Sequence, residues 1–138
     1  MKMEHNKSGC SNVFVYGTLL SGERNHDCFL HDSTCLGTAT LSGYDMYDLG
    51  TYPGIVPGSG RVKGEVYEVS EETLRSLDYL EGEGSLYIRK QAEVTTETGE
   101  VILAYIYVYN HSISGYKRIP ENLQPYTADW ENRNQATK

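Results

Sequence analysis

One glutamate stands where a side chain could carry out acid–base chemistry, inside an apolar pattern with helical spacing. Leu74, Leu77 and Leu80 define an arc of a helix, and Glu81 falls within that arc. Burial and the negative end of the helix dipole would both raise the pKa of a carboxyl group there, and a raised pKa suits a general base. The pattern leaves open that Glu81 only pairs with Arg89 or with a backbone amide.

A second candidate is the turn Tyr16-Gly17-Thr18-Leu19, which follows a short apolar run predicted to be a buried strand, Val13–Tyr16. Glycine at the end of a strand lets the chain turn sharply and exposes successive backbone N–H groups. Such groups can bind a carboxylate or a developing oxyanion. Taken alone, the tetrapeptide also fits ordinary strand-end geometry.

Four potential metal ligands lie within ten residues: His26, Cys28, His31 and Cys35. Two kinds of chemistry could use these residues: they could bind zinc, or a histidine could activate Cys28 as a nucleophile. The spacing matches no zinc finger, and neither Gly nor Pro supplies a tight knuckle. We therefore expect a loop with two thiols and two solvated histidines, no metal, and reduced cysteines, because three Cys without a C-x-x-C pair do not form a disulfide framework.

Composition excludes several classes of protein. With 138 residues the chain is expected to form one domain. Its net charge of −7, without a basic stripe, argues against nucleic acid as a partner. No apolar run approaches the roughly 18 residues of a membrane span, and the polar N-terminus resembles no export signal, so we expect a cytoplasmic protein without a membrane partner. The 12 Tyr suit a cavity that is apolar with polar edges.

The glutamate must be positioned by a helix, which the sequence predicts over Glu71–Glu81. Ser70 is a suitable N-cap and Gly82 a suitable C-terminal glycine. The same helical geometry places Asp78 at the flank of the apolar arc, and it directs Arg75 and Tyr79 away from it.

The remaining elements are mainly strands. Thr38–Met46 and Arg61–Val69 are predicted strands, with a long loop between them over residues 48–60 because that segment is rich in Gly and Pro. Gly64 indicates a bulge or a close approach. Tyr87–Thr95 and Val101–Tyr109 form a predicted hairpin across residues 96–99, which aligns Tyr105, Tyr107 and Tyr109 on one face.

A mixed loop over residues 110–125 and a polar tail over 127–138, anchored at most by Trp130, complete the chain. The fold class is therefore α+β: a mixed, mostly antiparallel small β-barrel or curled sheet with a few short helices. We expect one domain over residues 12–131, with polar tails at 1–11 and 132–138.

Five motifs follow one another along the chain: Val13-Phe14-Val15-Tyr16-Gly17-Thr18-Leu19, Tyr52-Pro53-Gly54-Ile55, Val62-Lys63-Gly64-Glu65-Val66-Tyr67, Leu77-Asp78-Tyr79-Leu80-Glu81-Gly82 and Tyr87-Ile88-Arg89. In this order they resemble the γ-glutamylcyclotransferase-like superfamily, in particular its small bacterial and γ-glutamylamine cyclotransferase members. Thr127-Ala128-Asp129-Trp130 also resembles the closing motif of the small bacterial members.

This resemblance implies an enzyme that converts a γ-glutamyl amide, either a γ-glutamylamine or a γ-glutamyl amino acid, to 5-oxoproline and a free amine without metal or cofactor. By similarity, Glu81 would be the general acid and base, and Tyr16-Gly17-Thr18-Leu19 would bind the γ-glutamyl portion. Tyr87 would lie at the pocket edge, and Tyr52, Pro53, Gly54 and Tyr105 would line the site of the leaving amine. Arg89 would be catalytic or structural.

The resemblance leaves two questions open. A second acid, Glu83, beside the proposed base could alter its pKa or indicate a different substrate. A member of this superfamily could also be a non-catalytic module that binds a small molecule or a protein in the same cavity. Neither the leaving amine nor the oligomeric state follows from the sequence.

Overall fold

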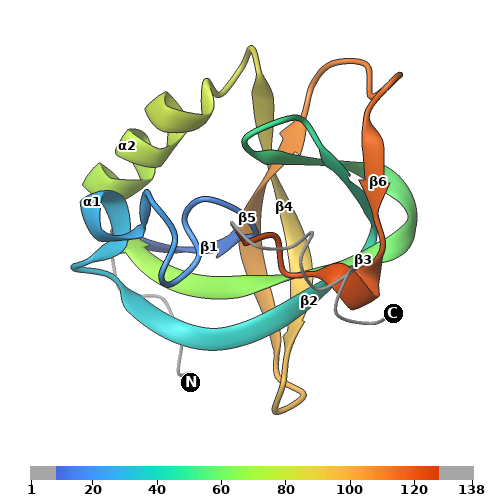
Figure 1. The fold of residues 1–138 in the computed structure, drawn as a ribbon. Helices are drawn as coiled ribbons and strands as arrows, with labels where there is room; N and C mark the ends of the chain where they lie inside the picture. The colour runs from blue at the N-terminus through green and yellow to red at the C-terminus, as the bar shows by residue number, and fades with distance from the viewer. Residues whose placement is uncertain (1–8, 128–138) are drawn as a thin grey trace.

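The computed structural model describes residues 9–127, which form a curled sheet with two helices together on one side of it (Figure 1). Among these residues, no helix is long and apolar enough to cross a membrane. The elements in chain order are β1 (Cys10–Val15), α1 (His26–Leu30), β2 (Thr34–Asp48), β3 (Pro53–Ser70), α2 (Glu71–Glu81), β4 (Tyr87–Thr96), β5 (Val101–Tyr109), β6 (Lys117–Ile119) and the 3-10 helix η1 (Glu121–Leu123).

The six strands follow the order β3-β1-β5-β4-β2-β6, and an additional pairing of β2 with β3 makes the sheet curl back on itself. β1 and β5 are parallel, whereas the other neighbours are antiparallel. The predicted hairpin of β4 and β5 is confirmed. The structure confirms the α+β class with a mixed, mostly antiparallel curled sheet.

The last three residues of strand β1, Val13–Val15, are buried on both faces, which explains why they form a continuous apolar run rather than an alternating one. Phe14 packs into the core inside the curled sheet, together with Ile106 and other residues of β5. Val13 and Val15 pack on the opposite side, in a second core that includes Leu77 of α2. The end of β1 therefore lies where the helices meet the sheet.

Helix α2 begins and ends where the sequence predicts. The Ser70 side chain accepts a hydrogen bond from the Thr73 amide at 3.1 Å, and Gly82 adopts a φ of +63° that favours glycine. Leu77 is fully buried, whereas Tyr79 is 90% exposed on the opposite face. The predicted orientation of the helix is thus confirmed.

The prediction of a long loop over residues 48–60 is wrong. β3 begins at Pro53 and pairs with β2 from there on, so that only residues 49–52 connect the two strands. Gly58 and Gly60 serve this pairing, because a Cβ at either position would collide with the Asp45 carboxylate. Gly64 makes the predicted close approach, since a Cβ there would collide with the carbonyl oxygen of Val15.

The predicted loop over 110–125 contains β6 and η1, and α1 was not predicted from the sequence. Both missed helices are short, and β6 forms only by pairing with β2. Residues 128–130 of the closing motif, and the rest of the predicted polar tail, lie outside the described residues.

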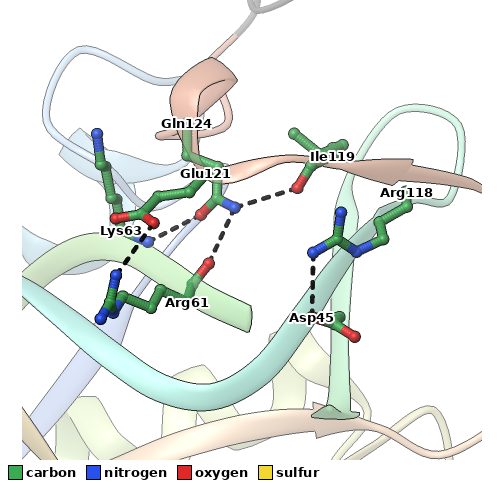
Figure 2. Close-up of polar contacts among 7 residues, drawn as sticks. All are labelled: Asp45, Arg61, Lys63, Arg118, Ile119, Glu121 and Gln124. Atoms are coloured by element: carbon green, nitrogen blue, oxygen red, sulfur yellow. Dashed lines mark hydrogen bonds and ion pairs between the residues drawn. The ribbon is translucent and has the colours of Figure 1, made fainter. Parts of the chain in front are cut away.

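Gln124 fastens the C-terminal segment to the curled sheet, as Figure 2 shows. Its Oε1 accepts a hydrogen bond from the Lys63 amide at 2.8 Å. Its Nε2 donates to the carbonyl oxygens of Arg61 and Ile119 at 3.1 and 3.2 Å. Gln124 is 5% exposed, and its amide group joins three backbone groups of different segments.

We therefore expect Gln124→Ala to lower the free energy of unfolding by about 3 kcal/mol, roughly 1 kcal/mol for each buried hydrogen bond lost. Urea unfolding measures the change. The control is Arg118→Ala, which removes a half-exposed ion pair with Asp45 at 3.4 Å and should cost less than about 1 kcal/mol. Equal losses in the two variants would contradict this role of Gln124.

Candidate active site

A cavity of about 250 Å³ opens at the end of β1, between the last turn of α2 and the 49–52 connection. Its wall combines apolar side chains, tyrosines, one carboxylate and one guanidinium. Eight of the residues expected at the site from the sequence line it: Tyr16, Gly17, Thr18, Leu19, Tyr52, Pro53, Glu81 and Tyr87.

Glu81 brings a carboxylate into this cavity from the last turn of α2. Removal from water raises its pKa from 4.5 to about 7. No other described residue donates a hydrogen bond to its carboxylate. The alternative that Glu81 pairs with Arg89 is wrong, because that guanidinium binds Asp78 at 2.8 Å instead.

Glu83, the neighbouring acid, does not share the site. Its side chain is exposed, and its Oε2 accepts a hydrogen bond from the Arg89 amide at 3.2 Å. Burial, rather than a second carboxylate, is the cause of the raised pKa of Glu81. A carboxyl group with this pKa can accept a proton and release it again near neutral pH.

Three buried tyrosines surround the carboxylate, and each donates its hydroxyl proton elsewhere. Tyr16 donates to the carbonyl oxygen of Tyr107 at 2.6 Å, and Tyr87 to that of Pro53 at 2.6 Å. Tyr107 donates to the Asp78 carboxylate at 2.7 Å. Burial raises the pKa of all three hydroxyls, and the charge of Glu81 raises it further. The hydroxyls therefore stay protonated and fix the cavity wall without stabilising the Glu81 carboxylate.

The Tyr16-Gly17-Thr18-Leu19 turn forms another part of the cavity wall. Gly17 lies so close to Pro53 that a Cβ would come within 2.7 Å of its ring, which explains the need for glycine. Asn25 holds the turn through two hydrogen bonds to Thr18. The Asn25 backbone amide donates to the Thr18 carbonyl oxygen, and its side-chain amide donates to the Thr18 hydroxyl oxygen, each at 2.9 Å. Within residues 9–127, the amides of Gly17, Thr18 and Leu19 find no hydrogen-bond acceptor. The three residues line the cavity.

Asp78 ties the helix end that carries Glu81 to the sheet. It accepts hydrogen bonds from Arg89 of β4 and Tyr107 of β5, and the Arg89 guanidinium stacks 4.5 Å from the centre of the Tyr105 ring. Arg89 lies outside the cavity lining. Its position answers the question left by the sequence: Arg89 holds the helix and does not reach the cavity.

Two expectations about the lining need correction. Tyr105 does not line the cavity, because its ring is covered by Arg89. Gly54 does not line it either, since it packs against Leu49 and Tyr109. Tyr107 takes the place expected of Tyr105, and Arg24 and Asn25 also line the cavity although no sequence pattern indicated them.

The histidine and cysteine cluster takes no part in the cavity. Cys28 and Cys35 are exposed, and His26 packs its ring against Tyr67 at 5.5 Å and contacts the carbonyl oxygen of Leu19 at 3.1 Å. In the described part of the chain, no group of three His, Cys, Asp or Glu side chains could hold a metal ion. The expectation of a loop with solvated histidines is thus wrong in part, because His26 and Cys28 belong to α1, Cys35 belongs to β2, and the His26 ring is packed against Tyr67.

Comparison with known proteins identifies the class to which this fold and cavity belong. The family described as "Gamma-glutamyl cyclotransferase, AIG2-like" matches residues 13–132. The chain belongs to this family and is an enzyme of the γ-glutamyl cyclotransferase kind.

Individual relatives cover most of the chain. The γ-glutamylcyclotransferase family protein YtfP of Escherichia coli K12 is 36% identical over 121 residues, which are 88% of this chain and 96% of the relative. The γ-L-glutamyl-butirosin B γ-glutamyl cyclotransferase of Niallia circulans is 37% identical over 127 residues, 87% of this chain and 75% of the relative. The crystal structure of an AIG2-like protein from Mus musculus has a TM-score of 0.70 at 29% identity, over 78% of this chain and 82% of that one.

The raised pKa of Glu81 predicts a pH-dependent cost in stability. Between pH 4.5 and about 7 Glu81 is ionised in the unfolded chain but still protonated in the folded one, so the free energy of unfolding falls as the pH rises. Above about pH 7 the carboxyl is ionised in both states, and the loss of stability no longer changes with pH. Glu81→Gln should therefore gain up to about 3 kcal/mol relative to the wild type on going from pH 4 to pH 8. Urea unfolding at both pH values measures this gain.

The control variant is Glu83→Gln, which removes an exposed carboxyl two residues away and should show a much smaller pH-dependent change. A gain for Glu81→Gln that is independent of pH would mean that the Glu81 carboxylate is not desolvated.

Proposed function

We propose that the protein converts a γ-glutamyl amide to 5-oxoproline and a free amine, with Glu81 as the group that moves the proton. The observation that carries this proposal is an unpaired carboxylate with a pKa of about 7 that shares a cavity with unpaired backbone amides. The name of the Niallia circulans relative supports a γ-glutamyl group as the part of the substrate that this family recognises.

The reaction is an intramolecular aminolysis. The α-amine nitrogen of the glutamyl portion attacks its own γ-carbonyl carbon, and Glu81 accepts the proton that this nitrogen loses. The resulting tetrahedral intermediate collapses when the bond from the γ-carbon to the leaving nitrogen breaks, and Glu81 returns the proton to that nitrogen. Atoms and charges balance within the substrate and one carboxyl group, so that the proposed chemistry needs no cofactor.

The turn and the tyrosines supply the remaining parts of this mechanism. Amides of Gly17, Thr18 and Leu19 donate to the substrate's α-carboxylate or to the oxyanion, where such fixed donors are most effective. Tyr16 and Tyr87 form a rigid wall, because their hydroxyls are fastened to backbone carbonyls. A rigid wall keeps the α-amine close to the γ-carbonyl and lowers the entropic cost of ring closure.

We expect the wild-type protein to release 5-oxoproline from at least one member of a panel of γ-glutamyl amides. Glu81→Gln should lower kcat about 10²- to 10⁴-fold, since it removes the proton carrier while preserving size. Chromatographic assay of 5-oxoproline gives both rates, and circular dichroism verifies that the variant is folded.

Glu83→Gln is the matched control, because its exposed side chain lies outside the cavity and glutamine can still accept the hydrogen bond from Arg89. It should retain turnover close to the wild type. Turnover by folded Glu81→Gln within about tenfold of the wild type would remove Glu81 as the proton carrier.

A further inference from the structure

Arg24 lies at the open edge of the cavity and is the single basic residue among the described residues that line it. Its Nη2 donates to the carbonyl oxygen of Thr51 at 2.8 Å, which places the guanidinium beside the 49–52 connection. The side chain is exposed, and it forms no ion pair with any other residue in the range 9–127. Its charge is thus available to a ligand.

The size of the cavity determines which part of a substrate would reach this edge. At about 250 Å³ it is smaller than the roughly 300–1,000 Å³ of pockets that enclose drug-sized ligands. In the proposed function, on which this inference rests, the γ-carbonyl must lie beside Glu81 and the glutamyl portion must contact the turn that includes Gly17. The substituent on the leaving nitrogen then points to the mouth, where Arg24 lies.

The chemistry of a guanidinium indicates what it would bind there. Arginine has five N–H donors, of which the bond to Thr51 uses one, and its planar fork matches a carboxylate. The Thr51 bond also orders the side chain beforehand, which reduces the entropy lost on binding. The chain has a net charge of −7 and a carboxylate in the cavity, so an acidic group on the substrate needs such a cation nearby.

We infer that Arg24 is a specificity-determining residue that binds a carboxylate on the leaving portion of the substrate. A γ-glutamyl amide whose leaving amine is an amino acid would then be preferred over an amide of the same size with a neutral leaving amine. The glutamyl α-carboxylate, by contrast, is bound by the turn and is common to both.

The test compares γ-glutamyl-alanine with γ-glutamyl-alaninamide, which differ only in the charge of the leaving portion. The ratio of their kcat/KM values is measured for the wild type and for Arg24→Gln. We expect the wild type to prefer γ-glutamyl-alanine about tenfold or more, mainly through KM, and Arg24→Gln to lose most of that preference. Arg75→Gln, which removes an exposed arginine of α2 outside the cavity, should retain the ratio.

An unchanged ratio in Arg24→Gln would overturn the inference. If Arg24 only bound the Thr51 carbonyl oxygen or the substrate's α-carboxylate, its replacement would lower the kcat/KM values of both substrates by the same factor. Calorimetric binding of the two compounds to Glu81→Gln, with and without Arg24→Gln, separates the inference from the proposed function. Preferential binding that depends on Arg24, without any turnover by the wild type, would support the inference and contradict the reaction. Absence of both binding and turnover would overturn both.

Discussion

The desolvation of one carboxylate, that of Glu81, is the constraint on which the rest of this structure depends. Its pKa of about 7 means that the folded chain keeps a charged group where water is scarce, at a cost in stability near neutral pH. The tyrosine hydroxyls that could have donated to it are bound to other acceptors, among them the carbonyl oxygens of Tyr107 and Pro53. Within the described residues the Glu81 carboxylate therefore has no hydrogen-bond donor that would lower its pKa.

Such a carboxylate stays in place only if the helix that carries it is fixed from several sides. The apolar face of α2 packs on β1, which ends at the turn that includes Gly17, so that helix and turn share one core. Asp78, one turn before Glu81, accepts hydrogen bonds from Arg89 and Tyr107, which belong to two strands of the sheet. These contacts fix the position of Glu81 in the wall of a small cavity that Gly17, Thr18 and Leu19 also line. Because the helix and the turn are both held by packing and hydrogen bonds, the residues of the cavity are preorganised.

Features with a local cause could be predicted from the sequence, whereas those that depend on distant partners could not. Helix α2 was predictable because its caps, Ser70 and Gly82, and its leucine spacing lie within one segment. The sequence predicts a loop for the segment 53–60 because its glycines indicate turns, but in the structure Gly58 and Gly60 make room for Asp45 of the paired strand. No sequence pattern predicts Arg24 at the site, because its position depends on a hydrogen bond to the carbonyl oxygen of Thr51, which is distant in the sequence.

The titration of Glu81 itself tests this account most directly. Selective ¹³C labelling of glutamate, with assignment by comparison to Glu81→Gln, allows the chemical shift of its carboxyl carbon to be followed by NMR from pH 3 to pH 9. The account predicts a midpoint at about 7 in the ligand-free protein. A midpoint close to the ordinary value of 4.5 would show a solvated or hydrogen-bonded carboxylate, and it would contradict the assignment of Glu81 as a desolvated acid–base group.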